Sequence, residues 1–192
     1  FCMIIMVNSF MHQSSAFGGA LLAANSILFQ IQFIMGDILT GLSQARAIYS
    51  GIAVGEHHKP MLNDTLRISI IWAIGFGLAQ SVGNYACRHA ILSCFTDLPS
   101  VIHTAQEYDL FIAFFPLISA LGIVYYGVFN GALYTKPICI SMLLTVSCYL
   151  TAYFTLIPLY GNIGLWLAFL VFYIARSGFL LLFVPKLQQR FA

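Results

Sequence analysis

Charged side chains are scarce in this sequence of 192 residues. It holds eight Lys and Arg and six Asp and Glu, which is 7% of the chain, against 60% apolar residues. Soluble domains carry about 25% charged residues, so the composition excludes a water-soluble globular protein and a separate soluble catalytic domain. A net charge of +2, spread along the chain, also excludes nucleic acid as a partner, because binding it needs a concentrated basic face. The expected surroundings are a lipid bilayer.

Sequence patterns of enzymes and metal sites are lacking as well. The five cysteines show neither a CxxC spacing nor a set of Cys and His ligands. His57 and His58 have no third ligand at metal-binding spacing, and there is no phosphate-binding loop. An intramembrane serine protease would need a glycine-flanked Ser and a His at one depth, and the serines near His12 lack that context. We therefore expect no enzyme, no metal site and no cofactor.

Long apolar stretches, separated by polar residues, Pro and Gly, divide the chain into six segments of about the 20 residues that a membrane-spanning helix needs. They cover residues 1–11, 18–49, 68–87, 110–134, 138–158 and 163–184, with a polar connector at 55–67. This pattern predicts an all-α polytopic membrane protein in which residues 1–192 form a single transmembrane six-helix bundle. Because the sequence starts at Phe1 inside an apolar run, we expect the first span to be truncated at its start.

Basic residues gather in alternate connections. Those after the second, fourth and sixth spans hold Lys59, Arg67, Lys136, Lys186 and Arg190, whereas the opposite side has only Arg88. Cytoplasmic loops are enriched in Lys and Arg. We therefore predict a multi-pass protein of the cell (inner) membrane with a cytoplasmic C-terminus.

Ionisable residues at membrane depth are costly and often functional, and two stand out. Asp37 interrupts the second span, where polar residues recur at steps of five to seven residues and predict one wall of a cavity: Asn25, Gln30, Asp37 and Gln44. Asp37 is interpreted either as a cation or proton site or as a structural carboxylate. Arg176, in the sixth span, is predicted to have a structural role. Its guanidinium would either bind an acceptor such as Asp37 or extend to the cytoplasmic interface.

Small residues and a proline mark further positions in the helices. Two GxxxG patterns, Gly51/Gly55 and Gly127/Gly131, are interpreted either as sites of close helix approach or as the ordinary glycine content of membrane helices. Pro116 lies inside the fourth span, where it removes a backbone donor and predicts a kink.

Four segments resemble the C-terminal half of one family, the multidrug and toxic compound extrusion (MATE) transporters. They are GLSQARAIYSGIAVGEHHKPML at 41–62, CFTDLPSVIHTAQEYDLF at 94–111, VYYGVFNGALYTKP at 124–137 and YGNIGLWLAFLVFYIARSG at 160–178. The last is the most specific, since its Gly-Asn-x-Gly-Leu-Trp start and its mid-helix Arg are similar to the final helix of the DinF-like branch. Together the segments follow the order and spacing of that family.

The resemblance implies a fold and a function. Members of this family have two six-helix bundles and exchange protons or sodium ions for organic, mostly cationic compounds. The chain would then be the C-terminal half of a cation-coupled multidrug efflux antiporter, and its partner would be an N-terminal six-helix half. Where the DinF-like branch often has an acid on the fourth helix of this half, this sequence has Tyr126. Tyr126 and Asn130 are the remaining candidates for the cavity wall.

Three alternatives stay open from the sequence. The first is half of a lipid-linked oligosaccharide flippase of the same superfamily, which would be recognised by a missing half that lines its cavity with many Arg and Lys. The second is a truncated, non-functional remnant, which the few acidic residues and the start at Phe1 favour. The third is a structural membrane subunit. The DNA upstream of Phe1 would separate the remnant from a transporter half.

Overall fold

The computed structural model describes residues 2–190, and these residues fold into eight α-helices. The helices are α1 (Cys2–Ala16), α2 (Gly19–Gly55), α3 (Lys59–Phe95), α4 (Pro99–Gln106), α5 (Asp109–Gly131), α6 (Thr135–Tyr160), α7 (Asn162–Leu182) and α8 (Val184–Arg190). Five of the segments are long and apolar enough to cross a membrane: α2, α3, α5, α6 and Asn162–Arg190. The prediction of an all-α membrane bundle is confirmed. Phe1, where truncation was expected, lies outside the described residues.

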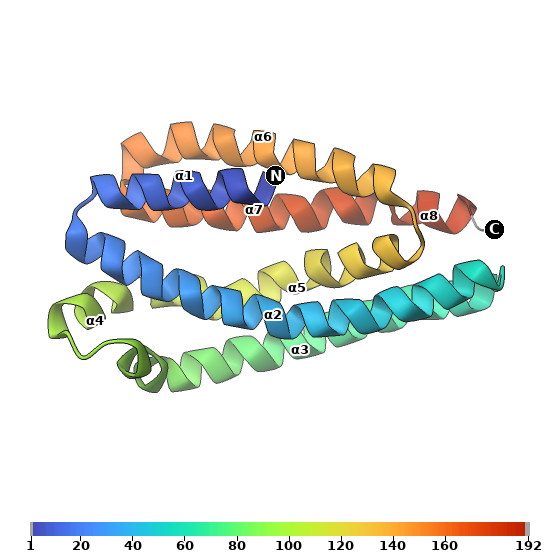
Figure 1. The fold of residues 1–192 in the computed structure, drawn as a ribbon, viewed down its shortest axis with the longest axis horizontal. Coiled ribbons are helices and arrows are strands. Elements are labelled where there is room, and N and C mark those ends of the chain that lie inside the picture. The colour runs from blue at the N-terminus through green and yellow to red at the C-terminus, as the bar shows by residue number, and fades with distance from the viewer. Residues whose placement is uncertain (1, 191–192) are drawn as a thin grey trace.

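The helices form two layers (Figure 1). One layer holds α1, α6 and α7, and the other holds α2, α3 and α5. Helix α5 lies at the centre, since 67% of its apolar 18-residue stretch is buried, against 22% of the corresponding stretches in α3 and α6. The largest core cluster fills the space between α1, α2, α5 and α7 with aromatic rings, among them Phe10, Phe29, Phe115, Trp166 and Phe169.

The connection between α2 and α3 is much shorter than the predicted polar loop at 55–67. Only residues 56–58 separate the two helices. Helix α3 starts early because Pro60 suits the first turn of a helix and the His58 ring accepts a hydrogen bond from the Met61 backbone N–H at 3.1 Å. Asp64 and Arg67 are exposed on this helix, so water can solvate their charges without a loop.

Helices α2 and α5 approach each other closely along one GxxxG pattern. A Cβ atom at Gly127 or Gly131 would collide with the backbone carbonyl of Ser43 or Ala47, so both positions require glycine. Gly55, in the other pattern, faces no atom within 4 Å. At Gly51 an added Cβ would lie 3.3 Å from the Gly131 carbonyl oxygen. The close-approach interpretation is therefore confirmed for Gly51, Gly127 and Gly131 and wrong for Gly55.

Serine hydroxyls of α2 reinforce this contact. Ser43 donates to the Ile123 carbonyl at 2.7 Å, and Ser50 donates to the Val128 carbonyl at 2.8 Å. Both serines are buried. Helices α2 and α5 are thus joined by close backbone contact and by two buried hydrogen bonds.

A side chain of α3 compensates for the proline in α5. Pro116 has no N–H and so leaves the carbonyl four residues earlier, that of Ile112, without its helical donor. Asn84 Nδ2 donates to this carbonyl at 3.3 Å. The proline therefore lies within a continuous helix, from Asp109 to Gly131, and the freed carbonyl ties α5 to α3.

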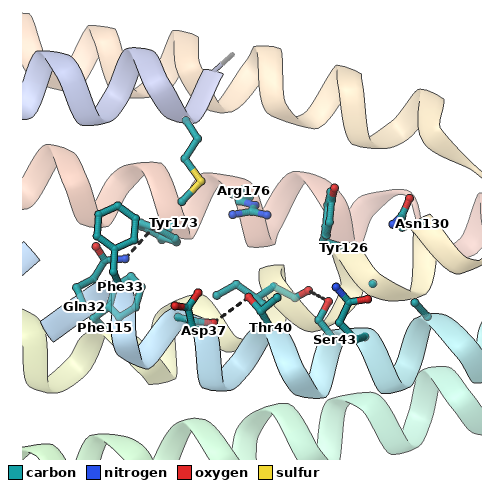
Figure 2. A pocket seen from close by; sticks show the side chains of 16 residues that line it. Gln32, Phe33, Asp37, Thr40, Ser43, Phe115, Tyr126, Asn130, Tyr173 and Arg176 are labelled. Carbon is teal, nitrogen blue, oxygen red and sulfur yellow. Dashed lines mark hydrogen bonds between the residues drawn. The ribbon is translucent and has the colours of Figure 1, made fainter. Parts of the chain in front are cut away.

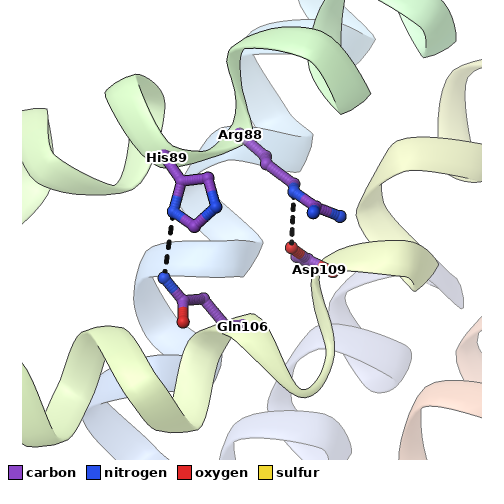
Figure 3. A network of polar contacts seen from close by, with 4 residues as sticks. All are labelled: Arg88, His89, Gln106 and Asp109. Atoms are coloured by element: carbon purple, nitrogen blue, oxygen red, sulfur yellow. Dashed lines mark hydrogen bonds and ion pairs between the residues drawn. The ribbon is translucent and has the colours of Figure 1, made fainter.

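Polar contacts also fasten the turn between α3 and α5 (Figure 3). Arg88 Nε lies 3.7 Å from Asp109 Oδ2, at the first residue of α5. Gln106 Nε2, at the end of α4, lies 3.1 Å from His89 Nδ1. The first contact joins α3 to α5, and the second joins α4 to α3.

Candidate functional site

A cavity of about 240 Å³ lies between α2, α5 and α7, with Met3 of α1 at its edge. Figure 2 shows side chains from the facing walls of this cavity. Five residues singled out from the sequence lie on its lining: Asp37, Gln44, Tyr126, Asn130 and Arg176. The structure therefore brings together residues from three helices that are far apart in the sequence.

Helix α2 supplies the polar wall. Asp37, Thr40 and Gln44 follow one another at steps of three and four residues, which places them on one face of a helix. Asp37 is exposed, and within residues 2–190 it forms no ion pair. The predicted alternative of a pair between Asp37 and Arg176 is absent from this structure, so the carboxylate is available to a ligand in the cavity.

Helix α7 supplies a cation to the opposite wall. The guanidinium carbon of Arg176 lies 5.5 Å from the centroid of the Tyr126 ring, on α5. Such a cation–π contact is worth about 0.5–2 kcal/mol. The sequence predicted a structural role for Arg176 and missed its place beside Tyr126. The resemblance to the DinF-like branch places Tyr126 where that branch often has an acidic residue. This was the one signal in the sequence that Tyr126 lies at the site.

Asn25 lies away from the cavity, in a buried polar cluster that joins α1, α2 and α7. Its Nδ2 donates to Ser14 Oγ at 2.8 Å and to Asn162 Oδ1 at 2.7 Å. Its Oδ1 accepts from Trp166 Nε1 at 3.1 Å. Gln30 is exposed and also lies outside the lining. Of the four residues in the predicted stripe, the cavity thus holds Asp37 and Gln44.

Sequence reasoning also missed polar residues that complete the wall. Gln32 is 2% exposed and lines the cavity. Its Nε2 donates to Tyr173 Oη at 3.2 Å, whereas its Oε1 has no hydrogen-bond partner among residues 2–190. Gln32 lies seven residues after Asn25 and five before Asp37, so it fits the same steps, but the predicted stripe contained Gln30 in its place. Within residues 2–190 no three His, Cys, Asp or Glu side chains gather as they would around a metal ion.

Apolar helices packed around a polar, charged cavity define one lobe of a membrane transport protein. The chain belongs to the MatE family, whose family model matches residues 1–154. Among curated proteins it is similar to the DNA damage-inducible protein F of Escherichia coli (strain K12), with 26% identity over 160 residues. That match covers 83% of this chain and 35% of the relative.

Solved transporter structures share the fold. The MATE transporter VcmN of Vibrio cholerae, in its bent form, superposes with a TM-score of 0.86 at 16% identity, over 97% of this chain and 43% of that one. A MOP superfamily transporter from Pyrococcus furiosus gives a TM-score of 0.76 at 18% identity, over 96% and 42%. The chain therefore spans less than half the length of the proteins it resembles and has the fold of one lobe.

Proposed function

We propose that this chain forms the C-terminal lobe of a cation-coupled multidrug efflux antiporter, driven by protons or sodium ions. The observation that carries the proposal is Asp37, a carboxylate without an ion-pair partner in residues 2–190 that lines a cavity halfway along α2. Membership of the MatE family and coverage of 43% of the VcmN chain support it. The remaining partner is an N-terminal six-helix lobe, which completes the substrate path.

The chemistry of the cavity suits exchange of cations. The Asp37 carboxylate binds a proton, a sodium ion or an organic cation, but only one at a time. Tyr126 and Phe33, which line the same cavity, offer ring faces that attract organic cations. Release of the coupling ion then accompanies capture of the substrate. Rocking of the two lobes against each other would carry the occupied site across the membrane.

Placement of the basic residues supports a cytoplasmic C-terminus in the inner membrane. The α2–α3 turn, the α5–α6 turn and the C-terminus lie at one end of the bundle (Figure 1). Lys59, Lys136 and Arg190 belong to the helices that start or stop at that end. The positive-inside rule assigns this end to the cytoplasm.

Gradient-driven transport by the full reading frame that contains these 192 residues tests the proposal. The protein is reconstituted in liposomes, and export of a cationic dye is followed under an imposed proton or sodium gradient. We expect Asp37→Asn to abolish gradient-dependent export and to leave thermal stability in detergent unchanged, since Asp37 is exposed. Asp64→Asn is the matched control, because Asp64 is exposed on α3 outside the cavity. Absence of export by the unaltered protein would favour the remnant or the structural subunit.

A further inference from the structure

The cavity carries two opposite charges on facing walls. Among the described residues that line it, Asp37 of α2 is the one carboxylic acid and Arg176 of α7 is the one basic side chain. Figure 2 shows them on opposite sides of the cavity. They form no ion pair with each other. Each charge is therefore free to meet a separate group of a bound molecule.

The hydrogen-bond donors of Arg176 are unused. A guanidinium has five N–H donors, yet within residues 2–190 Arg176 makes no hydrogen bond and no ion pair. The guanidinium carbon lies 5.5 Å from the centroid of the Tyr126 ring, and the charge also interacts electrostatically with Tyr173. Neither interaction is a hydrogen bond, so the N–H donors stay available. An arginine at membrane depth is costly unless it is paired or hydrated. A carboxylate that entered the cavity would supply the missing acceptor.

The two charges also determine which molecules fit best. A simple organic cation is attracted by Asp37 and repelled by Arg176, so the two Coulomb terms oppose each other. A molecule with one positive and one negative group gains from both, because opposite charges attract most strongly where water is scarce. Charge complementarity thus favours a zwitterion over a simple cation.

We propose that Arg176 binds an anionic group of the substrate, so that the preferred ligand is an aromatic zwitterion with its cation at Asp37 and its carboxylate at Arg176. This inference rests on the proposed transport function and names the substrate class of the same cavity. The Tyr126 ring holds the guanidinium in place and, with Phe33, offers apolar surface for the aromatic part of the ligand.

A pair of dyes tests the role of Arg176. A rhodamine with a free carboxylate is a zwitterion, and its methyl ester is a simple cation of nearly the same shape. Binding of both dyes to the full reading frame in detergent is measured by fluorescence anisotropy without any gradient. The readout is the ratio of the two affinities, because this ratio does not depend on the fraction of protein that is folded.

The unaltered protein is expected to bind the zwitterion more tightly than the ester. Arg176→Gln should weaken binding of the zwitterion by about tenfold to a hundredfold, the loss expected for hydrogen bonds to a charged group, and should leave the ester unchanged or bound more tightly. Arg176→Lys keeps the charge and should preserve the preference for the zwitterion. Arg46→Gln is the matched control: Arg46 lies on α2 outside the cavity lining, so the ratio should not change.

Equal weakening of both dyes by Arg176→Gln, no weakening of either, or tighter binding of the ester to the unaltered protein would each overturn the inference. The proposed transport function fails by a different result, namely the absence of gradient-driven export in liposomes. If the protein exports the ester but the affinity ratio does not depend on Arg176, the proposed transport function stands and the zwitterion site is contradicted. If the affinity ratio is as expected but no gradient-driven export is found, the zwitterion site stands and the antiporter function is contradicted.

Discussion

Asn25 and Asp37 lie on the same helix and have opposite surroundings. The amide of Asn25 is buried and bonded to Ser14, Asn162 and Trp166, so its polar atoms are satisfied inside the protein. The carboxylate of Asp37 is exposed in the cavity. One residue therefore stabilises the bundle, whereas the other is available for binding.

Loss of Asn25 should destabilise the protein without a direct effect on the cavity. Asn25→Ala leaves buried polar atoms of Ser14, Asn162 and Trp166 without partners, at about 1–3 kcal/mol for each stranded group. We expect a clear fall in the midpoint of thermal unfolding in detergent. Gln30→Ala, on the exposed side of the same helix, is the control and should leave the midpoint unchanged. Equal midpoints for the two variants would contradict the structural role of the cluster.

The sequence identified the polar residues of α2 better than their roles. Asp37 was found because a charge halfway along an apolar helix stands out. The role of Asn25 depends on Asn162, which is 137 residues away in the sequence, and no local pattern shows such a partner. The place of Arg176 depends on how α7 is rotated against α5, which tertiary packing decides.

Helix boundaries were the weakest element-scale prediction. Hydropathy placed the third span at 68–87, whereas α3 runs from Lys59 to Phe95. Its 37 residues correspond to roughly 55 Å of helix, well beyond the 30 Å or so of hydrocarbon in a bilayer. Hydropathy reports only the apolar part of a helix, whereas α3 extends beyond it through exposed polar residues such as Asp64. Among the described residues, five of the six predicted spans correspond, in order, to segments long enough to cross a membrane. The first predicted span corresponds to α1, which has only 15 residues.

Substitution of Gly127 should separate α2 from α5. In Gly127→Ala the new Cβ meets the backbone carbonyl of Ser43, which no change of rotamer can relieve. We expect a loss of about 1–3 kcal/mol of stability, typical of overpacking, measured by thermal unfolding in detergent. Gly83→Ala is the control, because Gly83 has no atom within 4 Å of a new Cβ and alanine favours the helix. A stable Gly127→Ala protein would show that the two helices can move apart at little cost.

At the scale of the whole molecule, the two ends of the bundle differ in charge. The end with the α2–α3 turn and the C-terminus carries most of the basic residues, and the end with the α6–α7 turn has Leu159 and Tyr160 exposed instead. This asymmetry predicts the orientation of the protein in the membrane.

Cysteine labelling tests that orientation. In a background without the five native cysteines, a membrane-impermeant thiol reagent added to intact cells should label Leu159→Cys, since Leu159 is 73% exposed. It should not label His58→Cys in the α2–α3 turn until the membrane is opened. The reverse pattern would show that the C-terminus lies outside the cell.

The hydrogen bond between Asn84 and the Ile112 carbonyl has a consequence for biosynthesis. Helices enter the bilayer in chain order, so α3 is made before α5. Until α5 meets α3, Pro116 leaves a carbonyl without a donor in lipid, which costs several kcal/mol. We therefore expect α3 and α5 to leave the insertion machinery together, because Asn84 of α3 supplies the donor that the Ile112 carbonyl of α5 lacks. Asn84→Leu would then slow the release of α5 into the bilayer during translation.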